Sequence, residues 1–124
     1  MNKYRGYADL LAFKKAFRLS MRIFTITKGF PKEEVFALTG QIRRSSRAVC
    51  GNIAEGYRKR RYPKHFISKL TDADGECSET EIWIEYSLQC EYIDKTTYQE
   101  LMNGYKEVGK LIGTMINKPN LFTW

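Results

Sequence analysis

The sequence predicts an all-α protein that folds as an antiparallel up-down-up-down four-helix bundle. Three observations lead to this prediction. Apolar residues recur every three or four positions in four long segments, short connections separate these segments, and no segment shows the alternation typical of strands. Short connections make successive helices antiparallel. A chain of 124 residues is long enough for one domain with one core, so we expect residues 1–124 to form a single four-helix bundle domain.

The first helix is expected at about residues 10–27. Its predicted core stripe consists of Phe13, Phe17, Ser20 and Phe24, flanked by Leu10 and Ile23. The helix should end within residues 28–31. Gly29 accepts a left-handed conformation, and Pro31 cannot continue the helical hydrogen bonds but suits a new first turn.

The other helices are expected at about residues 32–59, 63–90 and 95–117. The core stripe of the second consists of Leu38, Ile42, Ser45, Ser46, Val49 and Ile53. The third helix should begin at Pro63 and bury Phe66, Leu70, Ala73, Cys77, Thr80, Ile84 and Leu88. The fourth should bury Tyr98, Leu101, Tyr105, Val108, Ile112 and Met115.

The net charge of +7 conceals a segregation of charge along the chain. Residues 1–69 contain seventeen Lys and Arg against four Asp and Glu, whereas residues 70–124 contain four Lys and Arg against ten Asp and Glu. Such a distribution attracts a polyanion to one surface, or lets a basic face of one subunit meet an acidic face of another. Both interpretations remain open at this point.

Most of the cations lie on helix faces opposite the predicted core stripes, with few acids at i+4 to balance them. We interpret them as contacts to the phosphates of RNA or DNA, with an ordinary solvated helix face as the alternative. The predicted nucleic-acid-binding residues are Lys14, Lys15, Arg18, Arg22, Arg43, Arg44, Arg47, Arg58, Lys59, Arg60, Arg61 and Lys64.

The third helix predicts a contact between subunits. With its core stripe inward, Ile82, Trp83 and Tyr86 point outward beside the acids Asp72, Glu76 and Glu79. An apolar and acidic patch that meets a basic patch elsewhere on the same chain makes a heterologous contact, which closes into a ring. The alternative is that the facing is off by one residue and Trp83 lies at the core edge. The predicted interface residues are Asn52, Glu55, Glu79, Ile82, Trp83 and Tyr86.

Catalytic, metal-binding and targeting signals are not found. The chain has one histidine, His65, which cannot form a zinc site alone, and it shows no nucleophile elbow, phosphate loop or HExxH motif. We expect no cofactor and no enzymatic activity. The three cysteines, Cys50, Cys77 and Cys90, form no CxxC pair and are expected to be reduced. Without a signal peptide or a stretch of about 18 apolar residues, a cytoplasmic protein with no membrane association is expected.

The segments LTGQIRRSS (residues 38–46) and NIAEGY (residues 52–57), with YADL (residues 7–10), carry a family resemblance. The chain resembles the four-helix bundle family of 23S ribosomal RNA intervening-sequence proteins, which is similar to the accessory variability proteins of diversity-generating retroelements. The motif positions are Gln41, Ile42, Arg43, Arg44, Asn52, Ile53, Ala54, Glu55 and Gly56. Cys50 stands where the family often has a proline.

The resemblance implies a ring, commonly a homopentamer, with a role related to nucleic acid and no enzyme activity. Our leading hypothesis is therefore a ring-forming, RNA- or DNA-binding protein of low sequence specificity, accessory to an RNA-processing or reverse-transcribing protein partner. The rival hypothesis is a structural homo-oligomer whose arginines are used in subunit or protein contacts. A nuclease, which would need clustered acids and a metal, is a third and weaker hypothesis.

Overall fold

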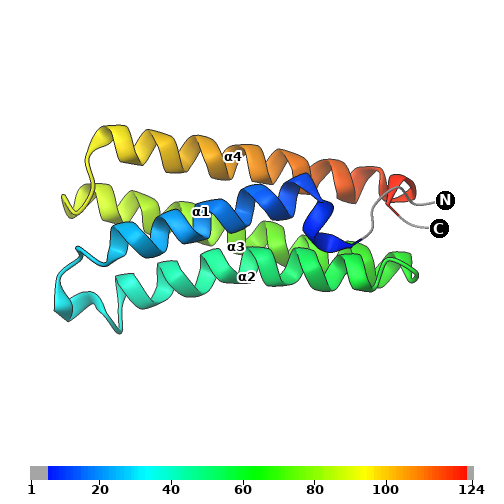
Figure 1. The fold of residues 1–124 in the computed structure, drawn as a ribbon, viewed down its shortest axis with the longest axis horizontal. Coiled ribbons are helices and arrows are strands. Elements are labelled where there is room, and N and C mark those ends of the chain that lie inside the picture. The colour runs from blue at the N-terminus through cyan, green and yellow to red at the C-terminus, as the bar shows by residue number, and fades with distance from the viewer. Residues whose placement is uncertain (1–5, 123–124) are drawn as a thin grey trace.

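The computed structural model describes residues 6–122, and every regular element in this range is helical. Four long helices form the molecule: α1 (Leu11–Thr27), α2 (Leu38–Arg58), α3 (Pro63–Gln89) and α4 (Lys95–Asn117). Single 3₁₀ turns, η1 (Tyr7–Asp9), η2 (Lys32–Glu34) and η3 (Pro119–Leu121), precede α1, connect α1 to α2, and follow α4. Successive helices run in opposite directions (Figure 1), which confirms the predicted all-α, antiparallel four-helix bundle.

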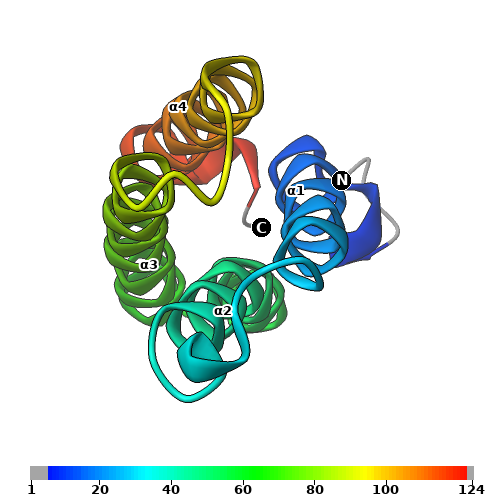
Figure 2. The same ribbon diagram turned by 90° about the vertical axis from the view of Figure 1, so that its left-hand side faces the viewer.

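The four helices follow one another in chain order around the axis of the bundle, so that each helix contacts its two neighbours (Figure 2). The start of α1, the end of α4 and the α2–α3 connection share one end of the bundle, and the other two connections share the opposite end (Figure 1). This arrangement follows from the short connections, which leave no chain length to cross the bundle.

One stripe from each of α2, α3 and α4 fills the core as the periodicity predicts. Tyr57 of α2, Phe66 of α3 and Tyr105 of α4 are the largest rings that are fully buried. Leu88 and Tyr98, which the stripes also included, are only partly buried. A buried polar contact crosses the same core, because Thr80 Oγ1 of α3 lies 2.8 Å from Ser45 Oγ of α2.

Helix α1 turns a different face to the core from the one predicted. Its buried residues are Ala12, Ala16, Ser20, Ile23 and Thr27. Phe17 is 52% exposed and Phe13 and Phe24 are partly buried, so the prediction that these three rings form the core stripe is wrong. Gly104 of α4 allows a close approach to α1, because a Cβ at this position would lie 2.6 Å from Leu19 Cδ2.

The α1–α2 connection also differs from the prediction. No glycine in the described residues has a positive φ, so Gly29 does not adopt the expected left-handed conformation; its N–H donates to the Ile26 carbonyl at 3.1 Å. The second helix begins at Leu38 rather than near residue 32, because η2 and a turn come first. The Glu34 carboxylate accepts a hydrogen bond from Leu38 N at 3.3 Å and thereby satisfies the first N–H group of α2.

The later helix starts follow the sequence signals. Pro63 is the first residue of α3, as predicted. Helix α4 begins after Asp94, whose carboxylate accepts the N–H of Thr97 at 2.8 Å. This bond lowers the pKa of Asp94. Helix α2 runs without interruption through Cys50.

Candidate nucleic-acid interface

The cations and acids of the chain lie on different sides of the bundle. The basic part of the chain forms α1, α2 and the start of α3, whereas the acids concentrate in α3 and α4. Helices α1 and α2 are neighbours in the bundle, and so are α3 and α4 (Figure 2). Segregation along the sequence therefore becomes segregation across the molecule, and one side presents a field that attracts anions.

Two of the predicted phosphate contacts on α1 are paired with acids of α4. Lys15 Nζ lies 2.9 Å from Glu107 Oε1, and Arg22 Nε lies 2.9 Å from Glu100 Oε2. The hydrogen bond from Arg22 lowers the pKa of the Glu100 carboxyl. Because their charges are already balanced within the chain, Lys15 and Arg22 are poor candidates for phosphate contacts.

Arg44 of α2 is paired in the same way, with Glu76 and Glu79 of α3. The hydrogen bond with Glu76 is the main reason that the pKa of Arg44 is raised. From the sequence, these two acids are predicted to lie on a patch that meets a basic surface of another subunit. In the structure both acids instead pair with Arg44 of the neighbouring helix α2 in the same chain.

Arg43 and Arg47 surround an aromatic ring of α1. The guanidinium carbons of Arg43 and Arg47 lie 4.8 and 5.8 Å from the centroid of the Phe24 ring, and Lys28 Nζ lies 4.8 Å from it. Arg43 Nε also donates to Thr27 Oγ1 at 2.8 Å. We call Phe24, Lys28, Arg43 and Arg47 the Phe24 cluster. Sequence reasoning missed Lys28 and assigned Phe24 to the core, although their i, i+4 spacing places them on one helix face.

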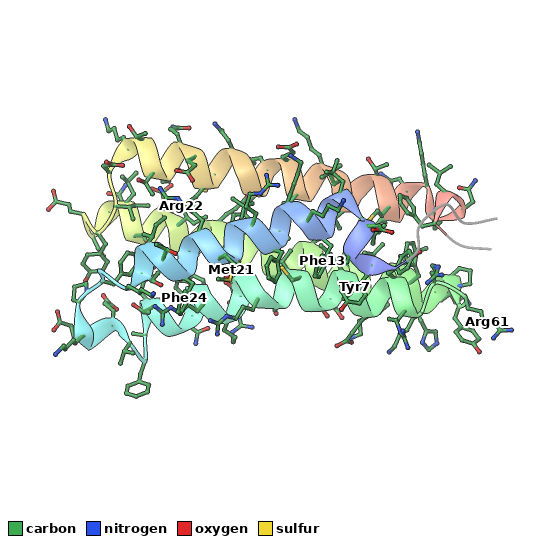
Figure 3. The ribbon with its side chains drawn as sticks, in the orientation of Figure 1. Tyr7, Phe13, Met21, Arg22, Phe24 and Arg61 are labelled. Carbon is green, nitrogen blue, oxygen red and sulfur yellow. The ribbon has the colours of Figure 1, made fainter. Side chains whose placement is uncertain are left out.

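Within residues 6–122, several predicted contacts form no ion pair at all. They are the exposed side chains Lys14, Arg18, Arg47, Arg58, Lys59, Arg61 and Lys64. Four of them, Arg58, Lys59, Arg61 and Lys64, surround the α2–α3 connection, and we call these four the basic end. Arg61 is labelled at this end of the bundle in Figure 3. Lys59 and Lys64 also line a shallow hollow of about 300 Å³ with His65, Ser68 and Lys69.

Arg60 differs from its neighbours in the same run. Its guanidinium carbon lies 3.8 Å from the centroid of the Tyr57 ring, and its Nη1 donates to the Tyr57 carbonyl at 2.9 Å. The hydrogen bond satisfies the Tyr57 carbonyl near the end of α2, and the cation–π contact holds the guanidinium over the Tyr57 ring. Arg60 therefore serves the helix terminus, whereas the four residues of the basic end point into solvent.

Two of the predicted interface residues are exposed as expected. Ile82 is 53% and Tyr86 55% exposed. Trp83 instead packs against the core, and its Nε1 donates to Glu79 Oε2 at 3.2 Å. The prediction that Trp83 points away from the core is therefore wrong, and its alternative, a place at the core edge, is correct.

The motif residues Asn52 and Glu55 make local contacts. Asn52 Nδ2 donates to the Ala48 carbonyl of its own helix at 3.0 Å. Glu55 pairs with Lys69 of α3 at 2.9 Å, which lowers the pKa of Glu55 and raises that of Lys69. Close approach of the two helices beside this bridge depends on Gly56, since a Cβ there would lie 3.3 Å from Lys69 Cβ. Glu55 therefore links α2 to α3.

The groups with chemical reactivity are dispersed. Cys50 and Cys77 are buried and free, and burial raises the pKa of both thiols, to about 12 for Cys77. Cys90 is free and exposed. In the described part of the chain, no three His, Cys, Asp or Glu residues stand together as metal ligands. No helix among these residues has the length and apolar character needed to span a membrane.

Comparisons with known proteins agree with this architecture. A model of the 23S rRNA-intervening sequence protein family matches residues 8–114. A crystal structure from Bacteroides thetaiotaomicron VPI-5482, described as a protein of unknown function from the S23 ribosomal protein family, is similar with a TM-score of 0.78 and 30% sequence identity. That similarity covers 86% of this chain and 96% of the other. A search of curated proteins finds no match. From residue 8 to residue 114 the match includes α1, α2, α3 and most of α4, and the chain belongs to the 23S rRNA-intervening sequence protein family.

Proposed function

We propose that this protein is a non-enzymatic, ring-forming protein that binds RNA or DNA through its phosphates, with little preference for sequence. The observation that carries the proposal is the set of exposed cations that form no ion pair with the described residues, concentrated at the basic end and along α1 and α2. Acids of the neighbouring helices neutralise Lys15, Arg22 and Arg44 but leave this set unbalanced. Unbalanced cations on one side of a molecule are the electrostatic footprint of a polyanion-binding surface.

The family supports a role related to RNA. The matching family model is described as a 23S rRNA-intervening sequence protein. In this role the chain would act as an accessory to a protein that processes or reverse-transcribes RNA, by holding the strand while its partner performs the chemistry. The contacts of such an accessory are mainly to the backbone, which carries no sequence information.

A specific observation favours the rival function of a structural homo-oligomer. Ile82 and Tyr86 are both more than half exposed on α3, and Phe36 in the α1–α2 connection is 96% exposed. Exposed apolar side chains of this size mark protein contacts. The two functions are compatible if the ring uses α3 and the nucleic acid uses the basic end.

The deciding experiment measures the affinity for RNA and DNA as a function of salt. Each phosphate contact contributes about −0.7 to −0.9 to the slope of log affinity against log salt, because binding releases condensed counterions. We expect Arg58→Gln, Lys59→Gln and Arg61→Gln together to lower the affinity and to flatten the slope by about 2 to 3. Arg60 stays unchanged, since it caps α2.

A matched control removes the same charge from the acidic side. Lys95, Lys110 and Lys118 are exposed on or next to α4, and none forms an ion pair with the described residues. Their joint replacement by Gln should leave the slope nearly unchanged. If both triple variants lose affinity equally, only net charge matters and the basic end is not the site. If the wild-type protein binds neither RNA nor DNA at low salt, the nucleic-acid function is wrong and the structural rival stands.

A further inference from the structure

An aromatic row runs along the exposed side of α1 and η1. The ring centroids of Tyr7 and Phe13 are 5.0 Å apart in an edge-to-face arrangement, and those of Phe13 and Phe17 are 6.0 Å apart and nearly parallel, at 27°. Phe17 is 52% and Met21 48% exposed. The sequence predicts that Phe13 and Phe17 of this row lie in the core, but the face of α1 with Ala12, Ala16 and Ser20 is buried instead. These rings are therefore left without an assigned role.

The row forms one wall of a groove with cationic sides. The groove is open to solvent, has a volume of about 480 Å³ and is lined by Ala8, Phe13, Lys14, Phe17, Arg18 and Met21. This volume is within the range of small-ligand pockets, about 300–1,000 Å³. Lys14 and Arg18 form no ion pair within residues 6–122, whereas Lys15 between them is held by Glu107. The groove therefore offers flat apolar surface and positive charge side by side.

The groove lies between two other groups of cations. Figure 3 places Met21, Phe13 and Tyr7 in order along the bundle, with Phe24 beyond Met21 and Arg61 beyond Tyr7. The Phe24 cluster thus stands at one side of the aromatic row and the basic end at the other. An elongated anionic ligand that follows the row would meet positive charge along its whole length.

We propose that this groove binds a single strand of nucleic acid, whose bases lie on the rings of Phe17 and its neighbours and whose phosphates contact Lys14 and Arg18. The proposal rests on the proposed function and specifies its mode. Each nucleotide of a single strand has a base with a flat apolar face and a backbone phosphate. This pattern matches the rings and cations that alternate along the groove. In a duplex the base faces are stacked on each other, so a duplex leaves these rings uncovered. An acidic helix of a partner protein would use the charges but has no need of parallel rings.

The test compares Phe17→Ala with the wild-type protein in binding to a labelled RNA strand of about 15 nucleotides, to the DNA strand of the same sequence, and to the corresponding duplex. Stacking on one side chain contributes about 1–3 kcal/mol, so single-strand affinity should fall at least about fivefold in RNA and DNA alike. Duplex affinity and the salt slope should not change, because no phosphate contact is lost. Leu121→Ala, which removes a similarly exposed apolar side chain next to α4, is the matched control and should bind like the wild type.

A second variant separates charge from stacking. Lys14→Gln with Arg18→Gln should flatten the single-strand salt slope by about 1.4, two contacts at about 0.7 each.

Circular dichroism should show Phe17→Ala as helical as the wild type, since the ring lies outside the core.

Three results would overturn the groove while leaving the proposed function standing. Phe17→Ala could bind single strands as well as the wild type does, or it could lose single-strand and duplex affinity equally. The variant could also bind normally while light scattering shows that its oligomer dissociates. That last result would mean that a second copy of the chain covers the rings. Failure of the wild type to bind any strand or duplex at low salt would instead refute the proposed function itself.

Discussion

Arg44 of α2 holds Glu76 of α3 with both arms of its guanidinium, with Nη1 3.2 Å from Oε2 and Nη2 3.3 Å from Oε1. Glu79 accepts a further hydrogen bond from Nη2. Bidentate pairs of this kind fix the relative position of the two helices as well as balancing charge. Arg44 thus serves the bundle, although its neighbours in the same RRSSR segment do not share its partners.

The contrast between Arg44 and Arg47 makes the first prediction. Arg44→Gln should lower the free energy of unfolding by about 1 kcal/mol or less, because the pair is partly exposed, and should leave the salt slope of RNA binding unchanged. Arg47→Gln should leave stability unchanged and flatten the slope by about 0.7 to 0.9, because Arg47 lies beside the Phe24 ring and forms no ion pair within residues 6–122. Chemical denaturation and binding titrations on both variants measure the two effects. The opposite assignment of effects would place the phosphate contact at Arg44.

A second prediction concerns the buried hydroxyl pair between α2 and α3. Thr80 Oγ1 lies 2.8 Å from Ser45 Oγ and 2.8 Å from the Glu76 carbonyl, and both side chains are fully buried. Thr80→Val keeps the shape but removes these bonds, which should cost about 1–2 kcal/mol of unfolding free energy. Ser45→Ala should cost about 1 kcal/mol, and the double variant should cost less than the sum, because each single change already breaks the shared bond. Strict additivity in denaturant titrations would show that the hydroxyls do not interact.

Two glycines of α2 should respond to alanine in opposite directions. Gly51 has open space around its Cβ position, so Gly51→Ala should raise the unfolding free energy by about 0.5–1 kcal/mol through helix propensity. At Gly40 an added Cβ would lie 2.9 Å from the Val35 carbonyl oxygen, a backbone atom that cannot step aside, so Gly40→Ala should destabilise the protein. Thermal melts of the two variants provide the comparison. Stabilisation by Gly40→Ala would mean that the connection before α2 yields easily.

The fourth prediction is assembly. Because Ile82 and Tyr86 expose large apolar surface on α3, we expect light scattering to report a discrete oligomer, with five subunits favoured by the family resemblance. Ile82→Asp should shift the protein to smaller species without loss of helix content, because the side chain lies outside the core. The matched control Leu11→Asp changes a side chain equally exposed on α1, and should leave the size unchanged. A wild-type monomer at micromolar concentration would contradict the prediction.

The periodicity of the sequence was sufficient for the bundle and for three of its four core stripes. In α2, α3 and α4 the residues of the predicted stripe are buried, except Leu88 and Tyr98, which are partly buried, because apolar residues at helical spacing favour burial of that face. Pro63 and Asp94 likewise mark helix starts by local chemistry, a missing N–H and a capping carboxylate, that does not depend on the rest of the fold.

Helix α1 shows where the sequence alone was insufficient. Two stripes with the same spacing run along it, one of rings that includes Phe17 and one of small residues that includes Ala16, and hydrophobicity favours the rings. Which stripe is buried depends on how closely α1 approaches its neighbours, and that distance is set by residues far away in the chain, such as Gly104. Packing between helices therefore decides which stripe of α1 is buried. As a result, rings predicted to lie in the core, such as Phe17, line an exposed groove instead.

The same distinction applies to the charged residues. The sequence itself determines that the first half of the chain is basic and that Arg58, Lys59 and Arg61 follow one another just before the helix start at Pro63. Which arginines are neutralised was decided only by the tertiary structure, because Glu76 and Glu100 reach Arg44 and Arg22 across helix interfaces and not along one helix. A sequence displays charges in order along the chain, whereas ion pairs depend on distance in space, and only the folded bundle brings these partners within hydrogen-bonding range.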